Sequence, residues 1–142
     1  MELYRDELRF RTTAETNVLD VTPQIAEIVL RSGVNEGQVL VFTPGSTAGI
    51  TTIELEPGAV ADLKRVFEEI APADGDYEHN MRWGDGNGYS HVRAALLGPS
   101  LTVPIADAQL VLGTWQQIIL CDFDNKPNRE RRVVVQVMGK AR

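Results

Sequence analysis

The sequence contains only one cysteine, Cys121, so no disulfide can form within this chain of 142 residues. No apolar run approaches the roughly 20 residues that a helix needs to cross a bilayer, and no secretory segment follows Met1. Positive charge is not in excess either, because the formal net charge is -6 at pH 7. Since nucleic acid and anionic membranes bind to cationic surfaces, we expect neither partner and predict a cytoplasmic protein.

Charge is nevertheless distributed unevenly along the chain. Residues 126–142 contain six basic side chains and a single acidic one, Glu130. Cations often protect the edge of a sheet, so one interpretation is a solvated strand and tail. The alternative is a patch that contacts an anionic ligand or a neighbouring subunit.

Length and composition favour one globular domain that spans residues 1–142. The hydrophobic content is 43% and the charged content is 24%, both ordinary for such a domain. Cys121 lies in an apolar run, which predicts a buried and inert thiol. The chain is long enough to bury a core without a metal or disulfide to stabilise it.

Hydrophobic periodicity predicts more strands than helices. Thr22 is a predicted N-cap of a helix that ends at Gly33, residues 59–71 form a second helix, and a short third helix could span residues 89–97. Strands are predicted at residues 2–12, 38–43, 50–56, 101–105, 109–112, 115–123 and 131–138. The last six would pair as three successive hairpins. We therefore predict an α+β fold, a largely antiparallel sheet or sandwich of about seven or eight strands with two or three helices.

Two of these strands carry apolar residues on both faces. They are the runs at residues 118–123 and 133–137. Two helices would not cover a sheet of this size, so we expect part of its surface to be buried between subunits.

The polar, glycine-rich stretch from Tyr77 to Ser100 holds both histidines of the protein, on either side of Asp85. Loops of this composition commonly carry functional groups. Imidazole and carboxylate are common ligands of zinc, so His79, His91 and Asp85 would form a divalent-metal site if folding brings them together. Alternatively, one histidine is a loop or capping residue and the other lies on a helix surface.

Two segments have the composition of an anion site. Glycines between residues 85 and 88 permit backbone N–H groups to turn toward one anion, next to a helix start with Arg93 one turn in. The small-residue turn at residues 43–49 is a similar case, since its hydroxyls could bind an anion. An ordinary turn and a hairpin tip are the alternatives. No Walker A sequence and no G-x-S-x-G nucleophile motif is present.

The chain contains five sequence blocks which, in this order, resemble those of the YjbQ family. The family is also described as secondary thiamine-phosphate synthases. The blocks are Thr43-Pro-Gly-Ser-Thr-Ala-Gly-Ile-Thr-Thr-Ile-Glu54, Tyr77-Glu-His-Asn80, Gly84-Asp-Gly-Asn87, the segment from His91 to Pro104, and Leu112-Gly-Thr-Trp-Gln116. The resemblance covers the chain from about Arg9 to Gly139. It implies a homotrimer that makes thiamine phosphate from a pyrimidine diphosphate and a thiazole phosphate.

The resemblance also implies a set of site residues. The histidine blocks and the acidic loop, regarded as metal-binding, correspond to His79, Asn80, Asp85, Asn87 and His91. Ser100, Thr114 and Gln116 would lie behind them, and Arg93 would add positive charge. We thus expect catalytic roles for His91, His79 and Asp85, and a bound zinc or magnesium ion.

One departure from the family pattern affects this expectation. Many members have histidine where this chain has Gly45. If that histidine completes a metal site, this chain has one ligand fewer. The alternative to an enzyme is a non-catalytic trimeric binding protein whose His/Asp loop holds a metal ion or a small anion.

Overall fold

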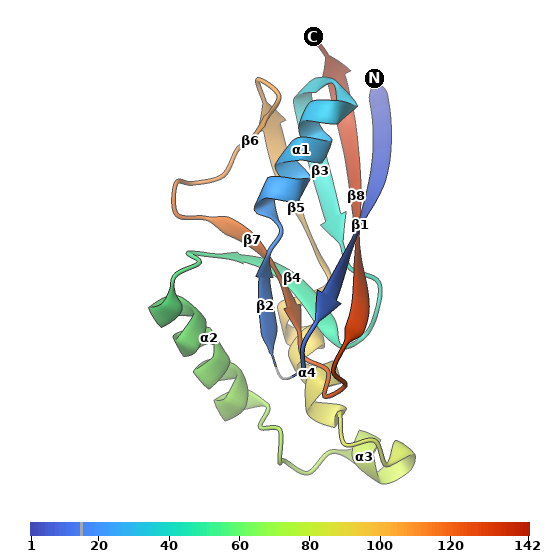
Figure 1. Cartoon of the computed structure of the whole chain (residues 1–142), viewed down its shortest axis with the longest axis vertical. Coiled ribbons are helices and arrows are strands. Elements are labelled where there is room, and N and C mark those ends of the chain that lie inside the picture. Colours follow the sequence, from blue (N-terminus) through green and yellow to red (C-terminus); the bar gives the residue numbers. More distant parts are fainter. Residues whose placement is uncertain (15) are drawn as a thin grey trace.

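The computed structural model describes residues 1–14 and 16–142, and within them it contains eight strands and four helices. The molecule is elongated, and both termini lie at the same end (Figure 1). The fold is α+β with antiparallel sheets, as predicted. Within the described residues, no helix is long and apolar enough to span a membrane.

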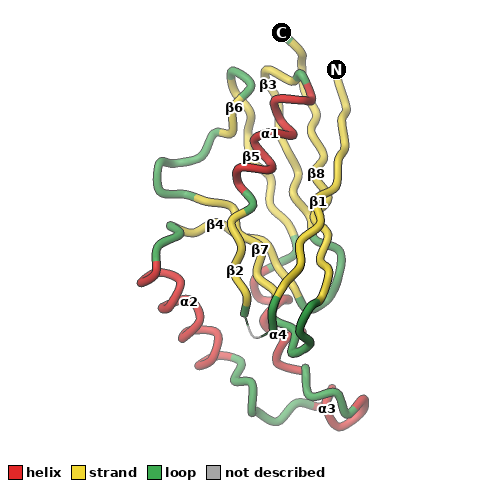
Figure 2. The backbone as a smooth tube through the Cα atoms, in the orientation of Figure 1, coloured by secondary structure: helices red, strands yellow, loops and turns green. Residues whose placement is uncertain are grey.

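Five strands form the larger sheet in the order β1-β8-β3-β5-β6 (Figure 2). They are β1 (Glu2–Thr12), β8 (Arg129–Ala141), β3 (Val34–Phe42), β5 (Ser100–Ala106) and β6 (Gln109–Leu110). Helix α1 (Thr22–Ser32) packs on one face of this sheet through Ile25, Ile28 and Val29, which are fully buried. These residues share one core with alternate valines of the strands, among them Val39, Val41, Val133, Val135 and Val137.

The opposite face of the larger sheet is partly apolar. Leu40 and Phe42 of β3 lie beside the β8 residues Gln136 and Val134, and Met138 lies next along β8. Leu40, Phe42 and Met138 are each between 36% and 38% exposed. Among the described residues, no helix covers this face in the way that α1 covers the other side (Figure 1).

Three further strands form a smaller sheet in the order β2-β7-β4, from β2 (Asn17–Asp20), β7 (Gln117–Asp122) and β4 (Ala48–Ile53). Ile118 and Leu120 of β7 belong to the core under α1. Ile119 and Cys121 belong instead to a second core with Phe67 of α2 (Pro57–Ile70) and Ala94 of α4 (Gly88–Leu97). Burial raises the pKa of Cys121 to about 12, so this thiol stays protonated, as expected for an inert one.

The central strand β7 is therefore buried on both faces by its own chain. The expectation that the apolar run at residues 118–123 needs a neighbouring subunit was wrong for this strand. The residues that cover it come from α2 and α4, and no pattern in the sequence placed these two helices on the same side. In the second run, residues 133–137, Val134 and Gln136 are half-buried in the chain, so for this strand burial between subunits stays a prediction.

Two of the three predicted hairpins do not form. Strands β3 and β4 lie in different sheets, and so do β7 and β8. Only β5 and β6 pair as predicted, with Ile105 opposite Leu110. The connections at residues 43–47 and 123–128 thus carry the chain from one sheet to the other, and they meet where Phe123 N–H donates to the carbonyl of Thr47 at 2.9 Å.

Two local predictions also need correction. The expected loop after Tyr77 contains a six-residue helix, α3 (Glu78–Trp83), which is too short to show a helical period. Thr22 does not cap α1, whose N-cap is Val21. The Thr22 hydroxyl is used elsewhere, since it accepts a hydrogen bond from Ile118 N–H at 2.7 Å.

Candidate functional site

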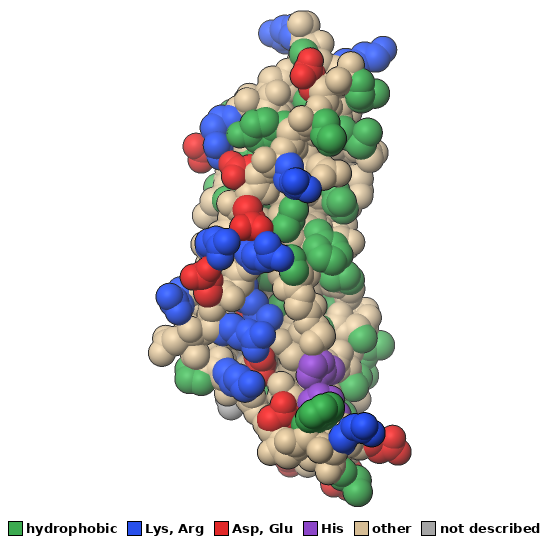
Figure 3. Space-filling view, turned by 90° about the vertical axis from the view of Figure 1, so that its right-hand side faces the viewer, with side chains coloured by type: hydrophobic (Ala, Val, Ile, Leu, Met, Phe, Trp, Pro, Cys, Tyr) green, Lys and Arg blue, Asp and Glu red, His purple; other side chains and the backbone are tan. Residues whose placement is uncertain are grey.

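The two histidines, twelve positions apart in sequence, lie against each other at one end of the molecule. Their ring centroids are 4.4 Å apart, and the ring planes are tilted by 41°. His79 comes from α3 and His91 from the first turns of α4. Figure 3 shows both rings on the surface, side by side. The convergence on which the predicted site depends is thus present.

Asn80 and Gly88 fix this arrangement of α3 and α4. The Asn80 side chain accepts a hydrogen bond from Gly88 N–H at 2.8 Å. A Cβ atom at position 88 would lie 2.5 Å from Cβ of Tyr77 and 3.0 Å from Oδ1 of Asn80, so only glycine allows the two helices to approach this closely. Asn80, predicted as a ligand-binding residue, therefore positions the helix that carries His91.

Two buried polar atoms at this site lack a hydrogen-bond partner within the described residues: Nδ1 of His79 and Oδ1 of Asn87. The nearest carboxylate oxygen to the first is Oδ1 of Asp85, at 3.6 Å. Asn87 is only 4% exposed. Because unsatisfied buried polar atoms are costly and rare, such a pair marks a place where a ligand or an ordered water belongs.

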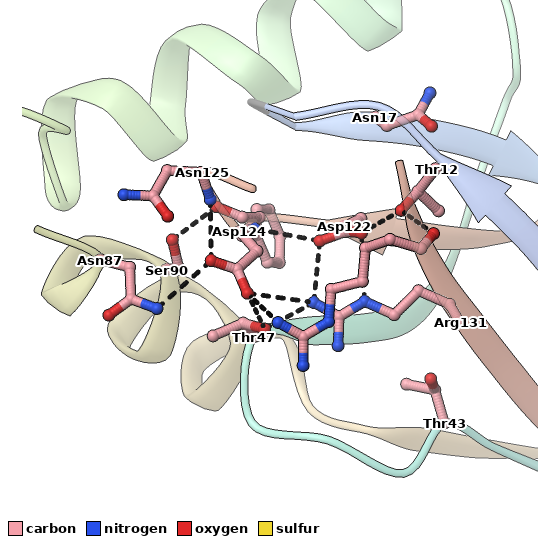
Figure 4. Close-up of polar contacts among 12 residues, drawn as sticks. Thr12, Asn17, Thr43, Thr47, Asn87, Ser90, Asp122, Asp124, Asn125 and Arg131 are labelled. Carbon is pink, nitrogen blue, oxygen red and sulfur yellow. Dashed lines mark hydrogen bonds and ion pairs between the residues drawn. The ribbon is translucent and has the colours of Figure 1, made fainter. Parts of the chain in front are cut away.

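Asn87 connects the histidine loop to a buried polar network between the two sheets (Figure 4). Its amide nitrogen donates to Asp124 at 3.2 Å. Asp124 also accepts from the Thr47 hydroxyl at 3.2 Å and forms an ion pair with Arg129. Burial alone would raise the pKa of Asp124, but the hydrogen bonds from Asn87 and Asn125 N–H and the charge of Arg129 outweigh it and lower the pKa.

A second buried carboxylate, Asp122, pairs with Arg131. The guanidinium donates to it from Nε at 3.1 Å and from Nη2 at 2.9 Å, and the Thr12 hydroxyl donates to the same carboxylate. Nη2 of Arg131 also donates to the Thr47 hydroxyl. Sequence reasoning missed this network. The available signal was charge inside apolar strands: Asp122 ends a buried run, and Arg131 precedes alternating valines.

Other predicted site residues lie elsewhere. Arg93 is buried and donates to Ala71 carbonyl, Thr16 hydroxyl and Glu68 carboxylate, so its guanidinium ties α4 to α2 and offers no donor to a ligand at the histidines. Ser100 and Gln116 line a separate groove of about 330 Å³ between β4 and β5. Thr114 is exposed in the connection that follows β6.

The predicted metal set is only partly assembled. Within residues 1–14 and 16–142, no group of three or more His, Cys, Asp or Glu side chains is arranged to hold a metal ion. His79 and His91 are close, but Asp85 stands beside one ring and is 35% exposed on its side chain. Two imidazoles with a carboxylate beside only one of them do not form the three-ligand site that catalytic zinc uses.

The pKa of His91 lies below its ordinary value. Burial is the larger cause, and the positive charge of His79 is the second; the carboxylates of Asp124 and Asp85 oppose them. Since the folded pKa is below the unfolded one, the folded chain binds this proton less readily. The unfolding free energy should therefore fall as pH decreases below about 6.5.

Two substitutions should move this pKa in opposite directions. His79→Ala should raise the pKa of His91, because it removes a neighbouring positive charge and part of the covering surface. Asp85→Asn should lower it further, because it removes an attractive negative charge. NMR titration of the His91 ring protons measures both pKa shifts. If the pKa of His91 moved in the same direction in both variants, the positions of His79 and Asp85 beside this ring would be contradicted.

Comparisons with known proteins place the whole chain in one group. A family model described as "UPF0047 protein YjbQ-like" matches residues 6–140. The UPF0047 protein of Methanothermobacter thermautotrophicus is 38% identical, over 99% of this chain and 95% of its own length. The UPF0047 protein YugU of Bacillus subtilis is 32% identical, over 93% of this chain and 97% of its own length.

Solved structures agree with this grouping. A YbjQ-like protein of unknown function from Sulfolobus solfataricus P2 has a TM-score of 0.92 at 32% identity, covering 98% of this chain and 99% of its own. An uncharacterised YjbQ/UPF0047 protein from Clostridium acetobutylicum has a TM-score of 0.85 at 34% identity, covering 94% and 99%.

Proposed function

This chain belongs to the YjbQ-like UPF0047 family, and on that premise we propose that it is a small-molecule enzyme acting on phosphorylated substrates through its paired histidines. The resemblance to secondary thiamine-phosphate synthases gives the substrates as a pyrimidine diphosphate and a thiazole phosphate. One observation carries the proposal. The rings of His79 and His91 lie against each other, and two buried polar atoms of the same loop, Nδ1 of His79 and Oδ1 of Asn87, have no hydrogen-bond partner among the described residues.

In the proposed transfer, the thiazole nitrogen forms a C–N bond with the methylene carbon of the pyrimidine while the C–O bond to the diphosphate breaks. Negative charge grows on the leaving diphosphate, so donors directed at it lower the barrier. The two imidazoles in contact are the groups at this site that can carry such a proton. That pair would donate a proton to the diphosphate.

We assign Asn87 a positioning role. Its amide nitrogen is held by Asp124, which leaves its carbonyl oxygen to accept from the substrate. A divalent metal is given no step in this reaction, because the described residues offer no three-ligand group. Metal binding belongs instead to the alternative, a non-catalytic protein whose His/Asp loop holds an ion.

We also propose that the chain forms a homotrimer, as the family resemblance implies. The partly exposed apolar side chains of Leu40, Phe42 and Met138 support an assembly that covers the outer face of the larger sheet. Burying such side chains fully is favourable by roughly 25 cal/mol per Å² of apolar surface.

The test is a direct assay of the purified protein with both substrates, followed by detection of thiamine phosphate. Asn87→Ala should lower product formation at least about tenfold, since the buried acceptor is lost. Asn35→Ala is the control for loss of an asparagine side chain, because Asn35 is half-buried and lies on β3. No product from the unaltered protein, together with a stoichiometric metal found by elemental analysis, would support the non-catalytic alternative instead.

A further inference from the structure

One nitrogen of the Arg131 guanidinium, Nη1, makes no hydrogen bond to the described residues. Its side chain is only 3% exposed, and its hydrogen bonds leave from Nε and Nη2 alone. Within the described residues, no side chain or carbonyl accepts from Nη1. The two hydrogens on Nη1 are therefore free to donate to a bound molecule.

Gly45 opens the way to this nitrogen. Its φ is +128°, and a Cβ atom built there would lie 3.0 Å from Nη1 of Arg131. Gly45 itself is exposed, whereas Thr47, two residues later, is buried and holds Nη2 of the same arginine. Because glycine has no side chain, position 45 leaves Nη1 of Arg131 uncovered where a Cβ atom would stand against it.

A second guanidinium approaches the same point. Arg129 pairs with Oδ2 of Asp124, and Nη2 of Arg131 lies 3.9 Å from that oxygen. Arg129 is 39% exposed on its side chain, so its remaining donors are accessible. Oδ2 of Asp124 thus lies close to both guanidinium groups, and it also accepts from the Thr47 hydroxyl of the turn at residues 43–47.

We propose that the turn at Gly45 is a binding site for a phosphate-type oxyanion, held by Nη1 of Arg131 with Arg129 beside it. Guanidinium groups match the spacing of oxygen atoms on phosphate and form charge-assisted hydrogen bonds to them. The site rests on the proposed function for the identity of the substrate, whose phosphate would bind here. Thr47, Asp124 and Asn87 connect this site to the histidine pair.

Inorganic phosphate is the probe, titrated into the purified chain by calorimetry with chloride as the background anion. Replacing Arg131 itself would risk unfolding, so the informative variant is Gly45→Ala, whose methyl group would stand over Nη1. It should weaken phosphate binding at least about tenfold. Gly98→Ala is the matched control: Gly98 has a φ of +93°, but a Cβ atom built there would meet nothing within 4 Å, so it carries similar backbone strain without the block.

Equal phosphate affinity in the unaltered chain and in Gly45→Ala would overturn the site, as would equal weakening by Gly98→Ala or no binding at all. These failures are separable from failure of the proposed enzyme. Product formation without phosphate binding would remove only this site. Phosphate binding that Gly45→Ala abolishes, in a chain that forms no product, would leave the site standing and remove the enzyme.

Discussion

Asp122→Ala should lower the free energy of unfolding by about 3–5 kcal/mol, the loss typical when one partner of a buried ion pair is removed. The change leaves Arg131 charged and 3% exposed, without the carboxylate that accepts from its Nε and Nη2. It also leaves the buried Thr12 hydroxyl without this acceptor. Urea denaturation followed by circular dichroism gives the unfolding free energy from the midpoint and slope.

Glu130→Ala is the control for this substitution. Glu130 accepts from Arg9 at 2.6 Å, but both side chains are largely exposed, at 46% and 59%. Water replaces such a partner easily, so this variant should unfold close to the unaltered chain. If both variants lost the same stability, the Asp122–Arg131 pair would not be the tie between the two sheets that the geometry indicates.

The importance of Asp122 could not be read from spacing in the sequence. Thr47 and Arg131 are 84 positions apart, and their contact exists only because two connections cross between the sheets at the same place. Alternation of apolar residues identified most of the strands correctly, since each strand has a face in a core. It carries no information on which strand lies beside which, and the hairpins assumed from sequence order at residues 38–56 and 115–138 were therefore wrong.

The histidine loop was more accessible to sequence reasoning. A polar stretch with glycines at 84, 86 and 88 cannot bury itself as a strand, so the exposure of residues 81–86 followed from composition, whereas the burial of Asn87 and Gly88 did not. Arg93 shows the limit of that reasoning. It is one turn into α4, as an anion site would require, but the helix rotation directs its guanidinium to Glu68 and Ala71.

The buried polar network gives a new meaning to Gly45, the glycine that stands where many family members have histidine. Glycine there removes a side chain next to Nη1 of Arg131. Catalysis in this chain would then depend on donors that bind phosphate oxygens and on the histidine pair. The largest loss of catalytic activity should accordingly appear when the His79–His91 pair is broken.

His91→Ala should reduce kcat/KM for thiamine phosphate formation by about 10²–10⁴, the range expected when a proton-transferring group is lost. His79→Ala should cost a similar factor, because the two ring centroids are 4.4 Å apart and the proposed proton transfer uses both rings together. The double variant should therefore be little worse than either single one. Steady-state kinetics of the three variants measure this non-additivity directly.

Met81→Ala controls for damage to the short helix α3, since Met81 lies between His79 and Trp83 and is 88% exposed. It should retain kcat/KM within about twofold, as surface substitutions usually do little. Thermal unfolding of His91→Ala within a few degrees of the unaltered chain would show that the loss is chemical. Full turnover by His91→Ala would mean that the two imidazoles, although in contact, take no part in the reaction.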